Sequence, residues 1–158
     1  MVTLTHRYAV HTEWTGNLGT GTSGYRAYSR NNTMTIDGKP GIDGSADRAF
    51  YGDADRWNPE DFLVASLSEC HMLSFLHAAT VNRVVVLGYT DDATGVMEQT
   101  EDGGGHFVSV TLRPRVMVAE AGMVDLANSL HAEAARKCFI AASVNFPVEH
   151  EPVAFVLA

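Results

Sequence analysis

The stretch that follows Asn58 constrains the fold of this chain more than any other, because it carries several start signals of a helix at once. The side chain of Asn58 can accept a hydrogen bond from the first helical turn. Pro59 suits the first helical position, and Glu60 and Asp61 place negative charge at the positive end of the helix dipole. The sequence therefore predicts a helix that begins at Pro59.

The helix predicted from this start is apolar on nearly every face. Between Phe62 and Ala79, Glu69 is the only residue of the Asp, Glu, Lys and Arg types. A helix without a polar face is expected inside a protein rather than on its surface. Because Cys70 lies near the middle of this segment, we expect its thiol to be sheltered from solvent.

A second helix is predicted later in the chain, from apolar residues that recur at spacings of three and four. This amphipathic pattern consists of Met123, Leu126, Leu130 and Ala134, and Cys138 continues it at its end. Both cysteines are therefore expected on helices whose apolar faces pack inward. Such packing allows the two thiols to meet in the core.

The rest of the chain is rich in strand and turn signals. Strands are predicted within residues 3–14, 83–92, 107–119 and 153–157, and Pro114 favours an edge or a break in the third of these. The glycine-rich string GNLGTGTSGY (16–25) favours a hairpin or bulge over a phosphate-binding loop, because no Lys-Ser/Thr pair closes it. Without repeats or linkers, residues 1–158 are expected to form one α+β domain.

Composition excludes some classes of function. Hydrophobic residues make up 46% of the 158 residues and charged ones 19%, which is ordinary for a soluble globular protein. The net charge of -8 argues against nucleic-acid binding, which depends on Lys and Arg that neutralise phosphates. No apolar run is expected to span a membrane, and the N-terminal residues lack a signal-peptide pattern. A cytoplasmic location is the resulting expectation.

The two cysteines of the chain, Cys70 and Cys138, suggest thiol chemistry. In a reducing compartment such a pair is more often free, catalytic or metal-bound than a structural disulfide. Peroxide reduction needs a thiolate nucleophile, a cation or donor that stabilises it, and a second thiol that traps the sulfenic acid. The sequence permits this chemistry, and it equally permits two inert buried thiols.

A zinc site is a competing interpretation of the same two helices. His77 follows Cys70 by seven positions and His131 precedes Cys138 by seven, so each pair can share a helix face. Neither spacing matches the short ligand separations that are usual in zinc motifs. His71 points about a quarter-turn away from Cys70 and is a poorer co-ligand. We therefore expect no metal site.

Two segments carry a resemblance to a known family. The string WNPEDFLVASLSECHML (57–73) resembles the signature of the OsmC/Ohr peroxidases, in which Asn-Pro-Glu opens a helix and a cysteine follows ten positions after the glutamate. HAEAARKCFIAASVNFPV (131–148) is similar to the family's second cysteine helix, and GTSGYR (21–26) to its opening strands. The resemblance covers nearly the whole chain. It implies an OsmC-like fold, with antiparallel strands around two central helices, in an intertwined dimer.

The same resemblance implies roles for individual residues. Cys70 matches the peroxidatic cysteine and Cys138 the resolving cysteine. Glu60 matches the glutamate that pairs with the catalytic arginine. Arg26 is the best match for that arginine, and Arg48 and Arg56 remain alternatives.

Two departures from the family pattern bear on the substrate and the reductant. Phe139 follows the second cysteine, where the better-known subgroups have proline, and His71 follows the first, where an apolar residue is more usual.

The implied function is reduction of organic hydroperoxides, and of hydrogen peroxide as a further substrate. An arginine favours the Cys70 thiolate, the thiolate is oxidised to a sulfenic acid, and Cys138 converts it to a disulfide. An external dithiol, either a small molecule or a lipoylated or thioredoxin-like protein, then reduces that disulfide. No cofactor is required. A non-enzymatic module that binds a small apolar ligand on the same fold is the alternative.

Helix geometry gives a separate reason to expect a homodimer. Ten residues along a helix correspond to a rise of about 15 Å and a rotation of about 280°. Glu60 therefore cannot touch Cys70 on one continuous helix. If both serve one site, Glu60 must act from a second subunit or through an intervening arginine.

Overall fold

The computed structural model of the chain describes residues 4–157, which divide into two compact units, Met1–Phe62 and Leu63–Ala158. The first unit contains an antiparallel sheet in the order β1 (His11–Trp14), β2 (Asn32–Thr35) and β3 (Ile42–Gly44). A short helical turn, η1 (Arg48–Phe50), follows β3. The predicted strand within residues 3–14 is therefore confined to its last four positions, and Thr3 lies outside the described residues.

The glycine-rich string 16–25 lies in the connection between β1 and β2, which confirms the expected hairpin arrangement. The two sides of the β1–β2 connection are joined where Ser29 donates its backbone N–H to the carbonyl of Gly16 at 2.9 Å. A β-carbon at position 16 would lie 1.9 Å from the carbonyl oxygen of Ser29, so this close approach requires glycine. The guanidinium of Arg30 fills the loop, 4.4 Å from the Tyr25 ring centre and 4.2 Å from that of Tyr28.

Helix α1 (Pro59–Val81) begins at the residue that the sequence predicts. The cap is reciprocal, because Asp61 donates its N–H to Asn58 Oδ1 at 2.7 Å and Asn58 donates its N–H to Asp61 Oδ2 at 3.2 Å. The helix ends where Arg83 adopts a left-handed conformation with φ 60°. There the N–H of Val84 bonds to the carbonyl of Ala79, as in a Schellman motif.

Burial of α1 is less complete than its composition predicts. One face is fully buried and consists of Leu67, His71, Phe75, Ala78 and Ala79. The expectation that the helix is enclosed on all sides is wrong, because Leu73 is 55% exposed and Val81 is 65% exposed. The expectation that no apolar run reaches membrane-spanning length is also wrong, since α1 meets that criterion by length and composition. Its buried face, however, packs against the helix and sheets of the second unit.

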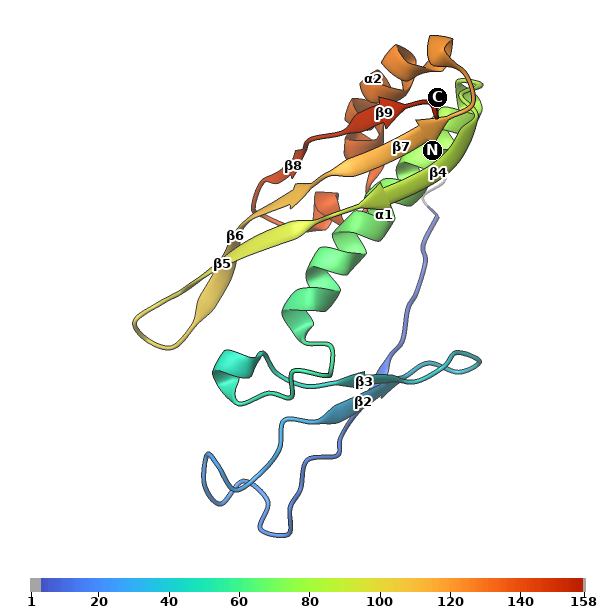
Figure 1. Cartoon of the computed structure of the whole chain (residues 1–158). Helices are drawn as coiled ribbons and strands as arrows, with labels where there is room; N and C mark the ends of the chain where they lie inside the picture. Colours follow the sequence, from blue (N-terminus) through green and yellow to red (C-terminus); the bar gives the residue numbers. More distant parts are fainter. Residues whose placement is uncertain (1–3, 158) are drawn as a thin grey trace. The chain divides into compact units, whose positions relative to one another are not determined.

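The second unit contains two three-stranded sheets. One has the order β4 (Val86–Asp91), β7 (Pro114–Val118), β9 (Val153–Phe155), and the other β5 (Thr94–Gln99), β6 (Gly105–Leu112), β8 (Val148–His150). Figure 1 shows β4 continuing into β5 alongside β6 continuing into β7. The predicted strand within 107–119 is interrupted after Leu112, as Pro114 indicates, and Pro114 begins the new strand.

Helix α2 (Val124–Lys137) is the crossover that brings the chain back to these sheets. A short turn, η2 (Ala121–Met123), precedes it, and another, η3 (Ala141–Ser143), follows it. Strands β8 and β9 then pair parallel with β6 and β7, an arrangement that requires a long connection. The α+β fold class with two helices is thus confirmed, with mixed rather than purely antiparallel sheets. The prediction of one domain over residues 1–158 stays a prediction.

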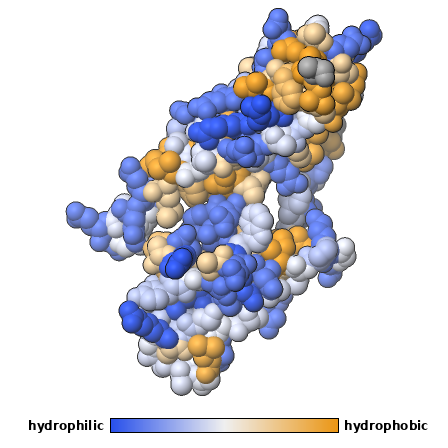
Figure 2. Space-filling view, viewed as in Figure 1, coloured by the Kyte–Doolittle hydropathy of each residue, from blue (hydrophilic) through white to orange (hydrophobic). Residues whose placement is uncertain are grey.

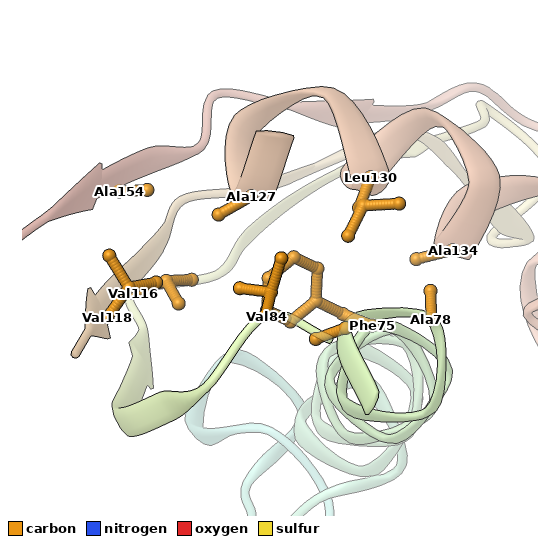
Figure 3. Close-up of a cluster of buried hydrophobic side chains, with 10 residues drawn as sticks. Phe75, Ala78, Val84, Val116, Val118, Ala127, Leu130, Ala134 and Ala154 are labelled. Atoms are coloured by element: carbon orange, nitrogen blue, oxygen red, sulfur yellow. The ribbon is translucent and has the colours of Figure 1, made fainter. Parts of the chain in front are cut away.

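The main core of the second unit lies between the two helices and the sheet of β4, β7 and β9. Figure 3 shows Phe75 and Ala78 of α1 facing Leu130 and Ala134 of α2. Small side chains close the cluster, namely Val84, which lies between α1 and β4, and Val116, Val118 and Ala154 of the strands. Phe75 is the largest side chain of the cluster and has no exposed surface.

Substitution of Phe75 tests this core. Phe75→Ala removes a fully buried ring, so we expect a loss of about 3–5 kcal/mol in the free energy of unfolding, from lost transfer energy and the cavity that remains. Urea denaturation followed by circular dichroism measures this loss. His77→Ala on the exposed side of the same helix is the control and should change stability by about 0.5 kcal/mol or less. Equal effects of the two substitutions would contradict the packing.

A candidate dithiol site

Cys70 occupies the middle of α1, next to the buried face of the helix. Its side chain is partly exposed and its thiol is free. Leu67 precedes it by one turn and His71 follows it, and both of these side chains are fully buried. The thiol therefore lies at the border between the core and the solvent.

Cys138 lies one residue beyond the end of α2, whereas the sequence predicts it on the helix itself. The backbone leaves the helix here with φ -73° and ψ 111°, and only 2% of the residue is exposed. The chain then turns through η3, so the backbone N–H of Ala141 points back and lies 3.4 Å from Cys138 Sγ. The expectation that both cysteines lie on helices is wrong for Cys138, because the helical pattern of apolar residues continues past the last helical hydrogen bond.

The structure brings the two thiols together, as the helix patterns predict. Cys70 lies close enough to Cys138 to raise the pKa of its thiol, and both cysteines are free. Burial, together with the neighbouring Cys70, raises the pKa of Cys138 to about 11. Cys138 is therefore a neutral thiol at physiological pH, and it can serve as a donor to the sulfur of Cys70.

A cluster of three histidines lies beside this dithiol. His71 Nε2 is 2.9 Å from His131 Nδ1, and the two rings are nearly parallel at 16°. The ring of His150, from the end of β8, lies 4.3 Å from that of His71. The ring of Phe75 stacks on that of His131, with the ring centres 4.1 Å apart. The cluster thus joins α1, α2 and the sheet of β5, β6 and β8 through aromatic contacts.

Burial governs the charge of these rings. Burial, together with the neighbouring His150, lowers the pKa of His71 to about 3 and that of His131 to about 4. The pKa of His150 is lowered by burial as well, although the nearby Asp91 carboxylate acts in the opposite direction. All three imidazoles are therefore neutral at physiological pH.

Asp91, at the end of β4, is the anion beside this cluster. Its carboxylate accepts a hydrogen bond from the Ser68 hydroxyl of α1 at 2.6 Å and another from the backbone N–H of Arg113 at 2.6 Å. Asp91 is partly buried, and these two hydrogen bonds fix α1 against the junction of β6 and β7.

The zinc interpretation draws no support from this geometry. His77, its proposed ligand on α1, is exposed, and the side chain that meets His131 is His71. Within residues 4–157, no group of three or more His, Cys, Asp and Glu side chains is arranged to hold a metal ion.

Glu60 lies in the first turn of α1, ten residues before Cys70 on the same unbroken helix. Its Oε2 atom is buried and has no hydrogen-bond partner among residues 4–157. A buried carboxylate oxygen is costly unless a donor meets it. The carboxylate is therefore suited to bind a guanidinium.

The candidate arginines all belong to the first unit and have different surroundings. Arg26 donates to the Tyr51 hydroxyl at 3.0 Å and lies over the same ring. Arg56 pairs with Asp43 at 3.4 Å and with Asp53 at 3.9 Å. Arg48 is exposed in η1. No hydrogen bond or ion pair joins any of the three to Glu60 within the described part of the chain.

A fourth arginine, Arg30, escaped the sequence analysis. It contributes to an apolar pocket of about 560 Å3 in the first unit, together with Trp14, Met34, Trp57 and Phe62. The rings of Trp57 and Phe62 are stacked at 5.6 Å within it. The guanidinium of Arg30 already donates to the carbonyls of Tyr28 and Tyr25, so it serves to hold the loop.

Sequence reasoning also missed the partnership of the buried histidines. A signal existed, since His71 and Phe75 repeat at the spacing of the buried face of α1 and His131 lies between Leu130 and Ala134. The approach of His150 from β8 has no sequence signal, because it depends on the parallel pairing of β8 with β6.

The fold and the contact between the two thiols define a small α+β protein with a dithiol where two helices meet. Residues 52–152 match the family model described as OsmC-like protein, and the chain belongs to this family. The resemblance found in the two cysteine segments is thereby confirmed. No curated protein sequence matches the chain.

Solved structures agree with this assignment. An OsmC-like protein of unknown function from Vibrio cholerae is 30% identical, with a TM-score of 0.84 over 94% of this chain and 100% of that one. An organic hydroperoxide resistance protein from Elizabethkingia anophelis has a TM-score of 0.67 at 17% identity, over 98% of this chain and 100% of that one. OhrB of Bacillus subtilis, an organic hydroperoxide resistance protein, has a TM-score of 0.62 at 18% identity, over 94% and 98%. The last two show the shared fold.

The environments of the two thiols predict different reactivities. Cys138 is buried and its pKa is raised to about 11, so very little of it is thiolate at pH 8. We expect iodoacetamide to label Cys70 at least tenfold faster than Cys138, as measured by mass spectrometry of the cysteine peptides. In urea the two rates should become similar. Equal labelling of the folded protein would show that Cys138 is not held in this environment.

Proposed function

We propose that this protein is a thiol-dependent peroxidase that reduces organic hydroperoxides, with Cys70 as the nucleophile and Cys138 as the resolving thiol. The observation that carries the proposal is the closeness of two free thiols, one partly exposed and the other buried and neutral. Membership of the OsmC-like family, and structural likeness to organic hydroperoxide resistance proteins, supports the same substrate class.

The different burial of the thiols suits the two roles. The Cys70 thiolate attacks the distal oxygen of a hydroperoxide, so the O–O bond breaks, an alcohol leaves and Cys70 becomes a sulfenic acid. The sulfur of Cys138 then attacks the Cys70 sulfur, and the Cys138 proton leaves with the hydroxyl group as water. A thiol that stays protonated until this second step does not compete with Cys70 for peroxide, because the thiolate is the nucleophile.

Glu60 is proposed as the positioning residue for an arginine. Its buried Oε2 atom favours a guanidinium partner, and a bidentate pair would hold the cation in a fixed orientation. Arg26 remains the first candidate, because its guanidinium is bound by a neutral tyrosine, whereas Arg56 is bound by two carboxylates. A cation held beside a thiol favours the thiolate form.

The site is proposed to be completed in a homodimer. Glu60 and Cys70 are separated by about 15 Å of helix rise, so a second copy that supplies Glu60 and its arginine explains how both serve one centre. The apolar surface left uncovered on the second unit also fits this proposal. Figure 2 shows it gathered where α1 ends and β4 begins, and exposed apolar residues there are Val81, Val85 and Leu87.

Turnover requires a second substrate. An external dithiol, either a small molecule or a lipoylated or thioredoxin-like protein, would reduce the Cys70–Cys138 disulfide by exchange. Such chemistry needs no cofactor and suits a reducing cytoplasm. The apolar surroundings of Cys70 favour an alkyl hydroperoxide over hydrogen peroxide, since each Å2 of apolar surface buried contributes about 25 cal/mol.

Peroxide consumption by cysteine variants tests the function. With dihydrolipoamide as reductant, the wild-type protein should consume tert-butyl hydroperoxide faster than hydrogen peroxide. Cys70→Ser should abolish consumption, because it removes the nucleophile. Cys138→Ser should allow a single turnover that stops at the sulfenic acid, which dimedone traps and mass spectrometry detects.

The same assay separates the alternatives. Activity that survives Cys70→Ser would exclude the proposed nucleophile, and a wild-type protein inert to both peroxides would favour a ligand-binding module on this fold. Arg26→Lys, Arg48→Lys and Arg56→Lys keep the charge but remove the bidentate geometry. Only the arginine that pairs with Glu60 should lower the rate of Cys70 oxidation substantially, by about tenfold or more.

The dimer is tested by analytical ultracentrifugation. We expect the wild-type protein to sediment as a dimer at micromolar concentration, since exposed apolar patches of this kind mark association sites. Leu87→Glu places a charge in the uncovered surface and should shift the protein toward monomer, whereas Glu101→Gln in the exposed β5–β6 turn should not. A wild-type monomer with full peroxidase activity would overturn this part of the proposal.

A further inference from the structure

Two side-chain contacts join the same two segments of the chain. Cys70 and His71 are neighbours on α1, while His131 and Cys138 lie two helical turns apart along α2 and its end. Cys70 meets Cys138, and His71 meets His131 at 2.9 Å between ring nitrogens. The histidine contact therefore lies between the same two segments as the cysteine pair, beside the packing of α1 against α2.

The histidine contact cannot survive protonation of both rings. One nitrogen must donate its hydrogen and the other must accept it. The remaining nitrogens, His71 Nδ1 and His131 Nε2, are buried without a partner among residues 4–157, so a proton added to either would be enclosed without an acceptor. His71 has no exposed surface and His131 has 2%.

The surroundings of the pair add no strong counter-charge. His150 of β8 faces His71, and its own Nε2 atom is buried without a partner in the described chain. From β4, the Tyr89 ring lies against Phe75, and Asp91 is the anion nearest to the cluster, already engaged by Ser68 and the N–H of Arg113. Phe75 of α1 covers the ring of His131, which belongs to α2.

We propose that the His71–His131 contact is a proton-sensitive clamp that holds Cys138 against Cys70, so that acid opens the clamp and disfavours the disulfide. The two histidines are positioning residues, which do not touch the peroxide. For its role in turnover this inference rests on the proposed peroxidase function, but the clamp itself concerns only the dithiol and its disulfide.

The direction of the effect follows from burial. In the closed state the pKa of each ring is held far below the ordinary value of 6.5, to about 3 for His71 and about 4 for His131. Once the contact opens and water enters, each ring regains an ordinary pKa. The clamp is therefore fully closed above about pH 6.5 and opens as the pH falls toward 4. Because two rings take up protons, the opening equilibrium can rise by as much as about a hundredfold per pH unit.

The thiol–disulfide equilibrium of the protein with glutathione measures the effect of the clamp on the disulfide without any peroxide. Protein dithiol and glutathione disulfide exchange to give protein disulfide and two glutathione molecules, so one S–S bond breaks and one forms while two electrons pass to glutathione. With all thiols protonated, no net proton is released, and the equilibrium constant should not depend on pH. For the wild-type protein we expect it to fall by about tenfold or more between pH 7 and pH 5. Each mixture is approached from both the oxidised and the reduced protein.

A non-titrating clamp provides the matched comparison. His71→Gln places an amide nitrogen near the position of Nε2, and His131→Asn places an amide oxygen near that of Nδ1, so the double variant can keep one hydrogen bond. Its equilibrium constant should vary less than about threefold over the same range, while His77→Gln, at an exposed position of α1, should follow the wild-type curve. An ionised Cys70 would make the constant rise rather than fall in acid, and it is common to all these proteins.

The outcomes are distinct. A wild-type constant that is independent of pH, or that falls equally in the double variant, overturns the clamp. If the double variant does not fold, the single variants His71→Gln and His131→Asn take its place in the comparison. If peroxide is not consumed in the earlier assay while the constant falls in acid only when both histidines are present, the peroxidase proposal fails and the clamp stands.

Discussion

The burial of one face of α1 is the constraint on which the second unit depends. Leu67, Phe75 and Ala78 lie on that face without exposed surface, and they meet both sheets and α2. A side chain of this kind contributes about 1.5–3 kcal/mol when it is fully buried. The helix therefore cannot shift along its axis without losing several such contacts. This fixed position is what gives Cys70 a defined place next to the end of α2.

The same face carries a polar residue, and it is the exception that gives the site its character. His71 is buried between Leu67 and Phe75, where its polar atoms are costly unless they are bonded. The bond to His131 meets part of that cost, and the tilted ring of His150 and the ring of Phe75, which stacks on His131, pack around the pair. An apolar residue would pack there at lower cost. The position of the pair beside the dithiol gives a physical reason for a polar contact at this depth.

Much of the fold follows from local signals in the sequence. The reciprocal cap of Asn58 and Asp61 and the break before Pro114 depend on neighbouring residues, and both are where the sequence predicts them. Strand β5 has no such signal, because Thr94–Gln99 is exposed at every position and lacks an alternating apolar pattern. The apolar spacing predicts a helix that includes Cys138, but α2 ends at Lys137, because this spacing does not show where helical hydrogen bonds end.

The candidate site was predictable to a smaller extent. The meeting of Cys70 and Cys138 follows from two helices that each bury the face beside a cysteine. The contact of His71 is not predictable from its position relative to Cys70 on the same helix, because its partner, His131, comes from α2. The surroundings of Arg26 and Arg56 depend on Tyr51 and Asp43, which are distant in sequence, so the pattern of the arginines alone does not rank them.

The parallel pairing of β9 with β7 has a consequence for how the chain is made. Residue 153 must be present before β9 can add to β7 at Arg115 and before Ala154 can donate its N–H to Asn128 of α2. Synthesis proceeds at about 5–20 residues per second. Helix α1 is therefore complete for several seconds before β9, the last strand of the sheet with β4 and β7, has been made. During that interval the apolar face of α1 and the thiol of Cys70 are without their final cover. The nascent chain is therefore most open to aggregation and to unwanted oxidation before its last strand is added.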